Sequence, residues 1–184
     1  MAKSKPRMVQ DDERQKQIAD LCGLTMLGSR SGVDAVDSSG RSYEIKSTTT
    51  RSVSTARDAG LSTIKKWRTW YWIIASGQSL QKGYVIEHLY IAHPDDLKDF
   101  LNKHEAILKK QRNTFRRVFS AAKRGGALSE DLAFVVALFD RRGNTINNPP
   151  IPLKLVAATA TELDVTKPQS IKRVLRAFVK SHPI

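Results

Sequence analysis

Three side chains in one short stretch of the sequence have the types needed to cut a phosphodiester: Asp34, Glu44 and Lys46. A hard divalent cation prefers oxygen ligands, and Mg²⁺ usually takes one or two carboxylates together with phosphate oxygen and water. Asp34 and Glu44 can supply the carboxylates, and the main-chain carbonyl of Ile45 can add an oxygen. The cation would activate water and neutralise charge on the phosphate. Lys46 can orient that water and place positive charge beside a pentacovalent transition state.

A β-hairpin is the element that must position these groups. Ser38-Ser39-Gly40 is a turn sequence, because glycine readily takes the positive φ of tight hairpin turns, and it separates strands expected at residues 32–37 and 41–47. Side chains alternate along a strand, so Glu44 and Lys46 share one face while the intervening apolar residues face a core. A solvated strand pair with incidental charges is the alternative, since a bare D-x(n)-E-x-K pattern also arises by chance.

The remaining sequence predicts an α/β chain of helices and of strands rich in Trp, Tyr, Ile and Val. Asp11 or Asp12 can cap the first helix and Ser170 the last, and the tryptophans fit core positions better than base stacking. The apolar stripe of the last helix predicts packing onto the body or onto a second subunit. The expected helices cover residues 11–22, 62–68, 94–123, 129–139 and a C-terminal stretch from 170, and further strands cover 52–58, 70–76 and 84–92.

Composition points to a polyanionic partner. The chain of 184 residues has 31 Lys and Arg against 18 Asp and Glu, a formal net charge of +13. Such a charge favours nucleic acid and predicts binding that weakens steeply with salt, although it would equally suit a ribosomal or architectural protein. A single cysteine, Cys22, excludes an internal disulfide and agrees with a cytoplasmic location. We expect no targeting signal and no membrane span.

Residues 23–47, which contain the three charged positions, resemble the PvuII-like type II restriction endonucleases of the PD-(D/E)xK superfamily. Further segments follow in the same order as in that family, while residues from about 102 to 143 are unmatched. Residues 53–55 are similar to the start of the family's recognition strand, and residues 146–154 are similar to the segment that closes the DNA site. The other two matching segments are 72–75 and 86–97.

The resemblance implies a fold, a reaction and partners. The fold is α/β, with a mixed central β-sheet flanked by helices, a helical insert and a C-terminal helix. The reaction is Mg²⁺-dependent hydrolysis of double-stranded DNA at a short palindromic site, leaving 5′-phosphates and blunt ends. A homodimer and a cognate DNA methyltransferase are the implied partners. One nuclease domain, 1–184, would comprise an N-terminal helix and dimer contact at 11–28, a catalytic and recognition core at 29–100, an insert at 101–143 and a DNA-site segment with the C-terminal helix at 144–184.

The same resemblance places DNA contacts on two segments. Where the family has a run of histidines this chain has Ala-Arg-Asp, so Arg57 can pair with guanine and Asp58 with cytosine. Ser54 and Thr55 can contact base edges or phosphates. Asn147-Asn148 matches asparagines that approach the bases, and an amide can pair with adenine; a simple turn is the alternative, because Asn and Pro suit turns.

The sequence allows two interpretations of the basic insert residues and more than one class of activity. The basic residues of the insert either form a solvated face or meet phosphates flanking the site; they are Lys109, Lys110, Arg112, Arg116, Arg117, Lys123 and Arg124. The chain is expected to be a site-specific nuclease, and the alternatives are a less selective repair or phage nuclease of the same superfamily and a non-catalytic DNA-binding protein.

Overall fold

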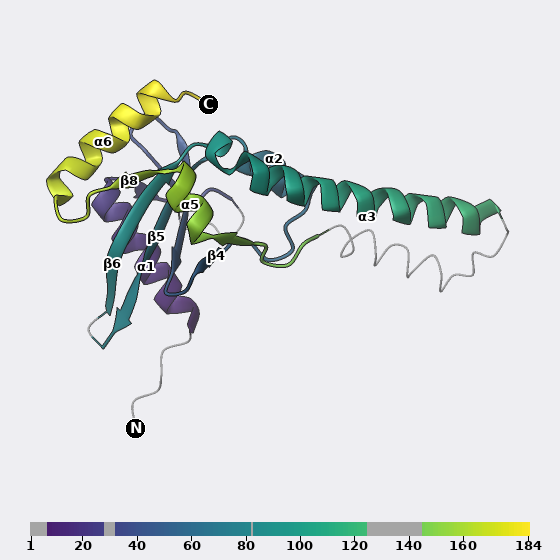
Figure 1. Ribbon diagram of the computed structural model, residues 1–184, viewed down its shortest axis with the longest axis horizontal. Coiled ribbons are helices and arrows are strands. Elements are labelled where there is room, and N and C mark those ends of the chain that lie inside the picture. The colour runs from purple at the N-terminus through teal and green to yellow at the C-terminus, as the bar shows by residue number, and fades with distance from the viewer. Residues whose placement is uncertain (1–6, 28–31, 82, 125–144) are drawn as a thin grey trace. The chain divides into compact units, whose positions relative to one another are not determined.

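A computed structural model describes residues 7–27, 32–81, 83–124 and 145–184 (Figure 1). The chain forms two compact units. The first comprises Met1–Ser54, Trp67–Leu97 and Pro150–Ile184, and the second comprises Thr55–Lys66 and Lys98–Pro149. The helix expected at 129–139 lies outside the described residues. The division into four functional segments drawn from the sequence stays a prediction.

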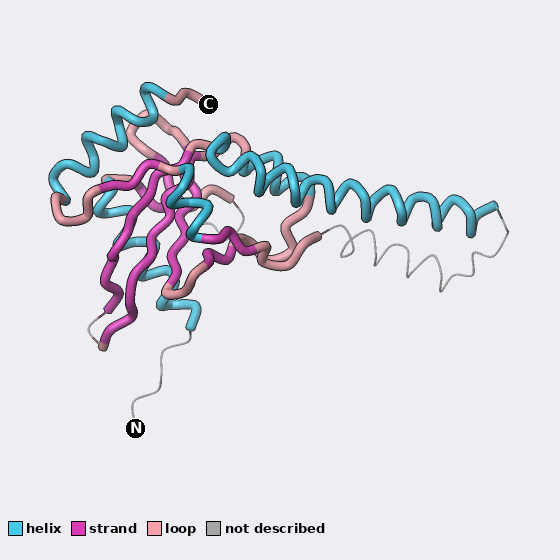
Figure 2. Tube along the Cα trace, viewed as in Figure 1, coloured by secondary structure: helices cyan, strands magenta, loops and turns pink. Residues whose placement is uncertain are grey.

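A mixed sheet of six strands organises the described part of the first unit (Figure 2). The central strands β3 and β5 are parallel, and all other neighbouring pairs are antiparallel. The strand order is β1 (Thr25–Met26), β2 (Ala35–Val36), β3 (Ser42–Thr48), β5 (Tyr71–Leu80), β6 (Gly83–Ala92) and β8 (Thr161–Leu163). The predicted α/β class with a mixed central sheet is thereby confirmed.

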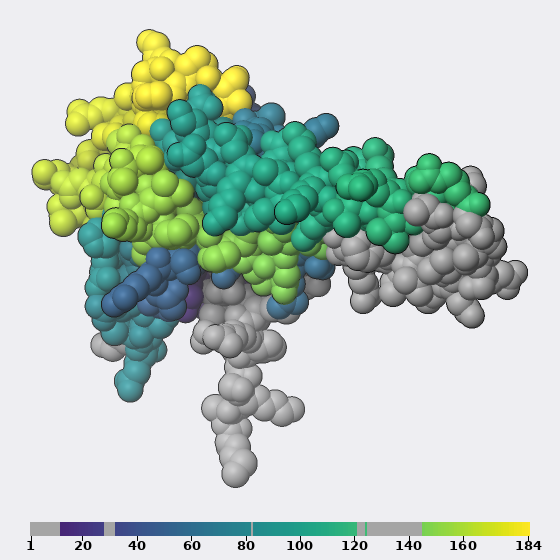
Figure 3. Space-filling model, turned by 45° about the vertical axis from the view of Figure 1, so that its right-hand side comes forward, coloured from purple at the N-terminus to yellow at the C-terminus, as the bar shows by residue number. Residues whose placement is uncertain are grey.

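One face of this sheet is closed by two helices, α1 (Arg7–Cys22) and α6 (Pro168–Ser181). Alternate apolar residues of the central strands join residues of both helices in one buried cluster; among them are Tyr43, Ile45, Ile73 and Ile91 from the sheet, Ile18 and Cys22 from α1, and Ile171, Leu175 and Phe178 from α6. The apolar stripe of α6 thus packs onto the body of its own chain. In the space-filling view α6 keeps its other side at the surface (Figure 3).

The sheet face opposite α1 and α6 carries aromatic side chains and also the charged residues of β3. In the parallel register Glu44 lies beside Trp72 and Lys46 beside Ile74. Trp67 packs edge-on against Trp72 with ring centroids 5.4 Å apart, and both indoles are buried. Their interpretation as core residues is correct. The short helix α5 (Leu153–Thr159) contacts β6 and the 3-10 helix η1 (Pro94–Leu97).

Several element boundaries differ from those expected. The first helix begins at Arg7, so neither Asp11 nor Asp12 caps it, whereas its end at Cys22 agrees with the prediction. The last helix begins at Pro168, whose fixed φ suits a first helical position, and Ser170 lies inside it rather than at its cap. Strand β1, strand β8 and helix α5 were not expected from the sequence.

The strand expected at 52–58 is the largest correction. β4 covers only Ser52–Ser54 and pairs antiparallel with β7 (Pro150–Pro152). The chain then turns, because Asp58 has a φ of +51°, which is incompatible with an extended strand. The remaining expected elements lie within a few residues of β2, β3, β5, β6 and α2 (Leu61–Trp67).

The second unit is built on α3 (Lys98–Arg124), an α-helix in which Phe100, Leu101, His104 and Leu108 are buried. The segment after β4 is tied to the segment before β7 by reciprocal main-chain bonds of 2.9 Å between Ala59 and Ile146. In the described ranges no helix is both long and apolar enough to cross a membrane.

The turn between β2 and β3 is held by one carboxylate, that of Asp37. It accepts hydrogen bonds from the main-chain N–H groups of Ser39 at 2.8 Å and Arg41 at 3.0 Å, and from the Tyr43 hydroxyl at 3.1 Å. The Arg41 guanidinium is 3.3 Å away, and Gly40 takes the expected positive φ of +78°. Burial raises the pKa of Asp37, but these bonds outweigh burial and lower it below its usual value.

Replacing Asp37 with Ala is expected to lower the free energy of unfolding by about 1–3 kcal/mol, because four donor groups lose their acceptor. Since the native pKa is lowered, the difference from wild type persists above the unfolded pKa of about 4. It disappears as pH falls through the native value. Urea denaturation between pH 7 and pH 2.5 measures it.

Asp20→Ala, at an exposed position of α1, is the control and should change stability by less than about 0.5 kcal/mol. An equal loss in both variants, or a loss at Asp37 that does not depend on pH, would contradict this account of the turn.

Candidate active site

Asp34 lies immediately before β2 and connects this part of the chain to the main chain of β3. Its own N–H donates to the carbonyl of Tyr43 at 3.2 Å, and its side-chain Oδ2 accepts from the N–H of Ile45 at 2.8 Å. β2 is only two residues long, so β3 continues beyond it without a strand partner on that side. The Asp34 carboxylate therefore replaces a strand carbonyl at this position.

Lys46 joins the two carboxylates. Its Nζ lies 2.8 Å from Glu44 Oε1 and 3.2 Å from Asp34 Oδ2. The side chains of Glu44, Lys46 and Asp34 are only 5%, 14% and 19% exposed, respectively. The structure thus brings the three side chains singled out from the sequence into one partly buried ionic cluster, and Glu44 and Lys46 share a face of β3 as expected from strand alternation.

Burial and charge set the protonation of this cluster. Burial lowers the pKa of Lys46, but the neighbouring Glu44 and Asp34 outweigh burial and raise it, so the side chain remains an ammonium. Burial raises the pKa of Glu44, and the charge of Asp34 adds to this effect while Lys46 opposes it. The ionised form of Glu44 is therefore poorly solvated, and an added cation would stabilise it.

The segments singled out as DNA contacts lie in two places. Ser54 is exposed at the end of β4 in the first unit, where it pairs with Pro150. In the second unit the hydroxyl of Thr55 donates to the carbonyl of Pro149 at 2.8 Å, and the N–H of Asn148 donates to the carbonyl of Ala56 at 3.2 Å. Residues 55–59 and 146–149, far apart in sequence, therefore lie side by side.

A family model described as Restriction endonuclease PvuII matches residues 6–116, more than half of the chain and all of the hairpin that carries Asp34, Glu44 and Lys46. The chain belongs to the PvuII restriction endonuclease family. It is a type II restriction endonuclease, that is, a site-specific deoxyribonuclease, and its family binds DNA and typically uses a divalent metal. The family resemblance seen in the sequence is confirmed for residues 6–116, which includes residues 102–116 that the sequence comparison had left unmatched. Asn147, Asn148 and α6 lie beyond the matched residues.

The ionic cluster of this PvuII-family chain has a donor set that fits a hard divalent cation. Both hydrogen bonds to the Asp34 carboxylate use Oδ2, and within the described residues Oδ1 accepts none. The poorly solvated carboxylate of Glu44 and the main-chain oxygen of Ile45 are adjacent in sequence. In the described ranges no three His, Cys, Asp or Glu side chains form a metal cluster. Two carboxylates suffice for Mg²⁺, which retains waters and binds phosphate oxygens.

Two of the candidate DNA contacts have an unusual backbone. Asp58 has a φ of +51° and Asn148 a φ of +43°, and Asp and Asn are the residues that most readily adopt this left-handed conformation. The turn interpretation of Asn147-Asn148 is therefore correct for the backbone of Asn148. Arg57, Asp58 and Asn147 nevertheless have exposed side chains, so the turn leaves them free to meet a ligand.

One residue beside the cluster was not singled out from the sequence. Gln15, on α1, donates from its side-chain Nε2 to the carbonyl of Ile45 at 3.2 Å. No motif connects the two positions, because the contact depends on how α1 docks against β3. A helical amide within reach of the strand could be found only once that packing is known.

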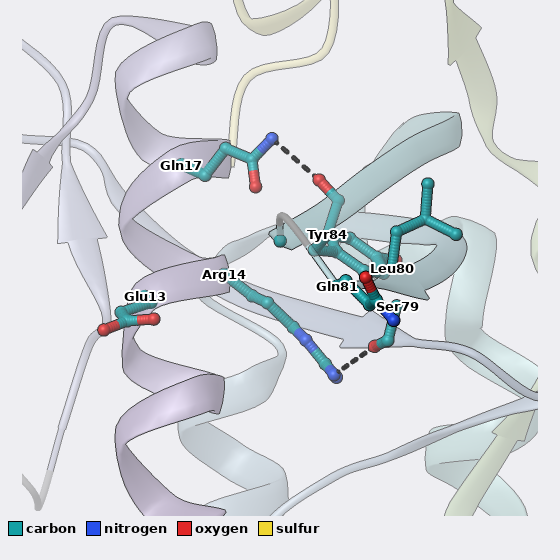
Figure 4. A pocket seen from close by; sticks show the side chains of 8 residues that line it. Glu13, Arg14, Gln17, Ser79, Leu80, Gln81 and Tyr84 are labelled. Atoms are coloured by element: carbon teal, nitrogen blue, oxygen red, sulfur yellow. Dashed lines mark hydrogen bonds between the residues drawn. The ribbon is translucent and has the colours of Figure 1, made fainter. Parts of the chain in front are cut away.

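A polar cleft of about 420 Å³ lies elsewhere in the first unit, between α1 and the β5–β6 hairpin. Arg14 reaches Ser79 Oγ at 2.6 Å and lies 5.0 Å from the centre of the Tyr84 ring, and Gln17 donates to the carbonyl of Tyr84 at 3.1 Å (Figure 4). None of the candidate catalytic residues lines this cleft. Its polar contacts attach α1 to the sheet.

Lys46→Met is expected to lower the free energy of unfolding by about 3–5 kcal/mol in the presence of EDTA, because two partly buried carboxylates lose their shared counter-charge. Urea denaturation measures the change. Lys16→Met, at an exposed position of α1, is the matched control.

The double variant Glu44→Gln/Lys46→Met should recover part of the lost stability, since one of the two unpaired charges is gone. If Lys46→Met were no less stable than Lys16→Met, the ionic cluster would not contribute to the stability of the fold.

Proposed function

We propose that this endonuclease uses Asp34, Glu44 and Lys46 for Mg²⁺-dependent cleavage of double-stranded DNA at a short palindromic site, leaving 5′-phosphates and blunt ends. The observation that carries the proposal is the contact of one ammonium, Lys46 Nζ, with both carboxylates, at 2.8 and 3.2 Å. An ammonium and two carboxylates in a partly buried cluster are groups suited to metal-assisted hydrolysis of a phosphodiester.

In the proposed reaction Asp34, Glu44 and the carbonyl of Ile45 would hold Mg²⁺. When bound, the cation would activate water and neutralise charge on the phosphodiester. The oxygen of water bonds to phosphorus as that water releases a proton to solvent. The bond to the 3′-oxygen breaks, and this oxygen takes a proton from solvent, which leaves a 5′-phosphate and a 3′-hydroxyl. The raised pKa of Lys46 makes it a donor that stabilises negative charge on the phosphate rather than a base.

The exposed side chains of the second unit are proposed to read bases. Arg57 can give guanine two hydrogen bonds, Asp58 can accept from cytosine, and Asn147 or Asn148 can pair with adenine in the major groove. The hydroxyl hydrogen of Thr55 is already donated to Pro149, so this hydroxyl would meet a base amino group as an acceptor. Ser54, exposed at the end of β4, is the remaining proposed contact.

The basic residues of α3 are proposed to meet phosphates that flank the site. A surface hollow of about 520 Å³ between α2 and α3 is lined by Lys65, Lys109, Arg112 and Arg116, with Glu105 as its acidic member. Lys109 pairs with Glu105 at 2.6 Å, which leaves an excess of positive charge. In the space-filling view, side chains of α3 up to residue 120 lie at the visible surface (Figure 3). Such contacts would hold the duplex without reading its sequence.

A homodimer is the simplest assembly for cutting both strands of a palindrome, because a two-fold axis in the protein matches that of the DNA. We propose this assembly for the present chain. A methyltransferase that modifies the same site is its proposed functional partner, since a site-specific nuclease would otherwise cut the DNA of its own cell.

Digestion of a fully sequenced plasmid with Mg²⁺ tests the reaction. Wild type should give fixed fragments whose sequenced ends are blunt, carry 5′-phosphates and share one palindrome. Lys46→Ala should be slower by at least about 100-fold, because the positive charge at the phosphate is lost. Lys16→Ala, which removes an exposed lysine of α1, is the control and should cleave at the wild-type rate.

Other outcomes have distinct meanings. A smear from wild type would favour the less selective nuclease of the same superfamily. Staggered ends would contradict the proposed blunt cleavage alone. Salt-sensitive DNA binding without cleavage by either protein would contradict the catalytic role of the three residues.

Arg57→Ala is expected to cost about 1–3 kcal/mol of discrimination at a single base pair of the site. Arg112→Ala should instead weaken binding to every sequence and reduce the slope of log K against log salt by about 1. Competition binding to cognate and single-substitution duplexes, in Ca²⁺ at several salt concentrations, compares the two variants. Unchanged sequence preference in Arg57→Ala would remove Arg57 from the reading of bases.

A further inference from the structure

The proposed metal ligand Ile45 lies at an open edge of β3. β2 pairs with Ser42 and Tyr43 but extends no further along the strand. Tyr43 presents its carbonyl to this edge, where it accepts from Asp34. Because alternate residues of a strand direct their main-chain groups to the same side, Ile45 presents its N–H and C=O to that edge too.

Two side chains satisfy these edge groups in place of a strand. The N–H of Ile45 donates to Asp34 Oδ2 at 2.8 Å, and its C=O accepts from Gln15 Nε2 at 3.2 Å. The two bonds hold the peptide groups on both sides of Ile45. A carbonyl oxygen has two lone pairs, so one bond from Gln15 leaves the second available for a cation.

We propose that Gln15 is a positioning residue of the divalent-cation site: its amide holds and polarises the Ile45 carbonyl, which acts as a ligand. This inference rests on the proposed function, because it takes Ile45 as part of the metal site. Hydrogen bonds that orient a ligand act through that ligand, and their loss typically costs about 10- to 100-fold in metal affinity or activity. Gln15 itself need not touch the cation or the DNA.

The same helix provides a matched control. Gln17, two residues along α1, makes a bond of the same kind, from its Nε2 to the carbonyl of Tyr84 at 3.1 Å (Figure 4). That bond reaches the β5–β6 hairpin rather than β3. Gln15→Met and Gln17→Met each remove one amide-to-carbonyl bond from α1 with little change in helix propensity.

Calorimetric titration of the full-length protein with Mn²⁺, a substitute for Mg²⁺, tests the proposal without relying on activity. Gln15→Met should bind Mn²⁺ about 10-fold or more weakly than wild type, whereas Gln17→Met should match wild type. At saturating Mg²⁺, Gln15→Met should have a reduced kcat with an unchanged KM for the plasmid. Both variants should have similar thermal midpoints, which separates positioning from folding.

Three results would overturn the inference. Equal Mn²⁺ affinity in wild type and Gln15→Met would do so while leaving the proposed function intact, provided that wild type cleaves DNA. An equal loss in Gln15→Met and Gln17→Met would assign the effect to the attachment of α1. Absence of both Mn²⁺ binding and cleavage in wild type would overturn the proposed function, and this inference with it.

Discussion

The carboxylate of Asp34 is the group on which the geometry of the cluster depends. One oxygen atom accepts from the Ile45 N–H and from the Lys46 ammonium. It is therefore both a structural acceptor for the strand and one side of the ionic cluster. A change that removes the acceptor oxygen at this residue would alter the strand edge and the charge balance together.

Placing these charged side chains on β3 lowers the stability that the sheet would otherwise have. Glu44 and Lys46 are largely removed from water, and desolvation of paired charges typically offsets much of their attraction. The stabilisation comes from the other face of β3, where Tyr43 and Ile45 pack in the cluster shared with α1 and α6. Parallel pairing with β5 from Tyr43 to Thr48 keeps the strand extended. The charged face is tolerated because the apolar face is well packed.

The features that depend on local pattern were the ones the sequence predicted. Gly40 marked the turn, and strand alternation placed Glu44 beside Lys46 and Tyr43 in the core. Features that depend on tertiary contact were not predicted. The bond from Gln15 to Ile45 requires α1 to be docked, and β8 is three residues within a polar segment that pairs only because β6 offers an edge. The expected strand could not extend to residue 58, because Asp58 has a positive φ that no alternation pattern reveals.

The two faces of β3 also constrain how this strand can change over time. In a strand at the surface of a sheet, substitutions are usually tolerated at every second position, because one face meets solvent. β3 has no such face: one side is core, the other is the ionic cluster, and its open edge is held by side chains from two other elements. Among active variants, tolerated substitutions should therefore not recur at every second residue of β3. New sequence specificities would arise most readily at residues 55–59 and 146–149, where exposed side chains lie on a turn.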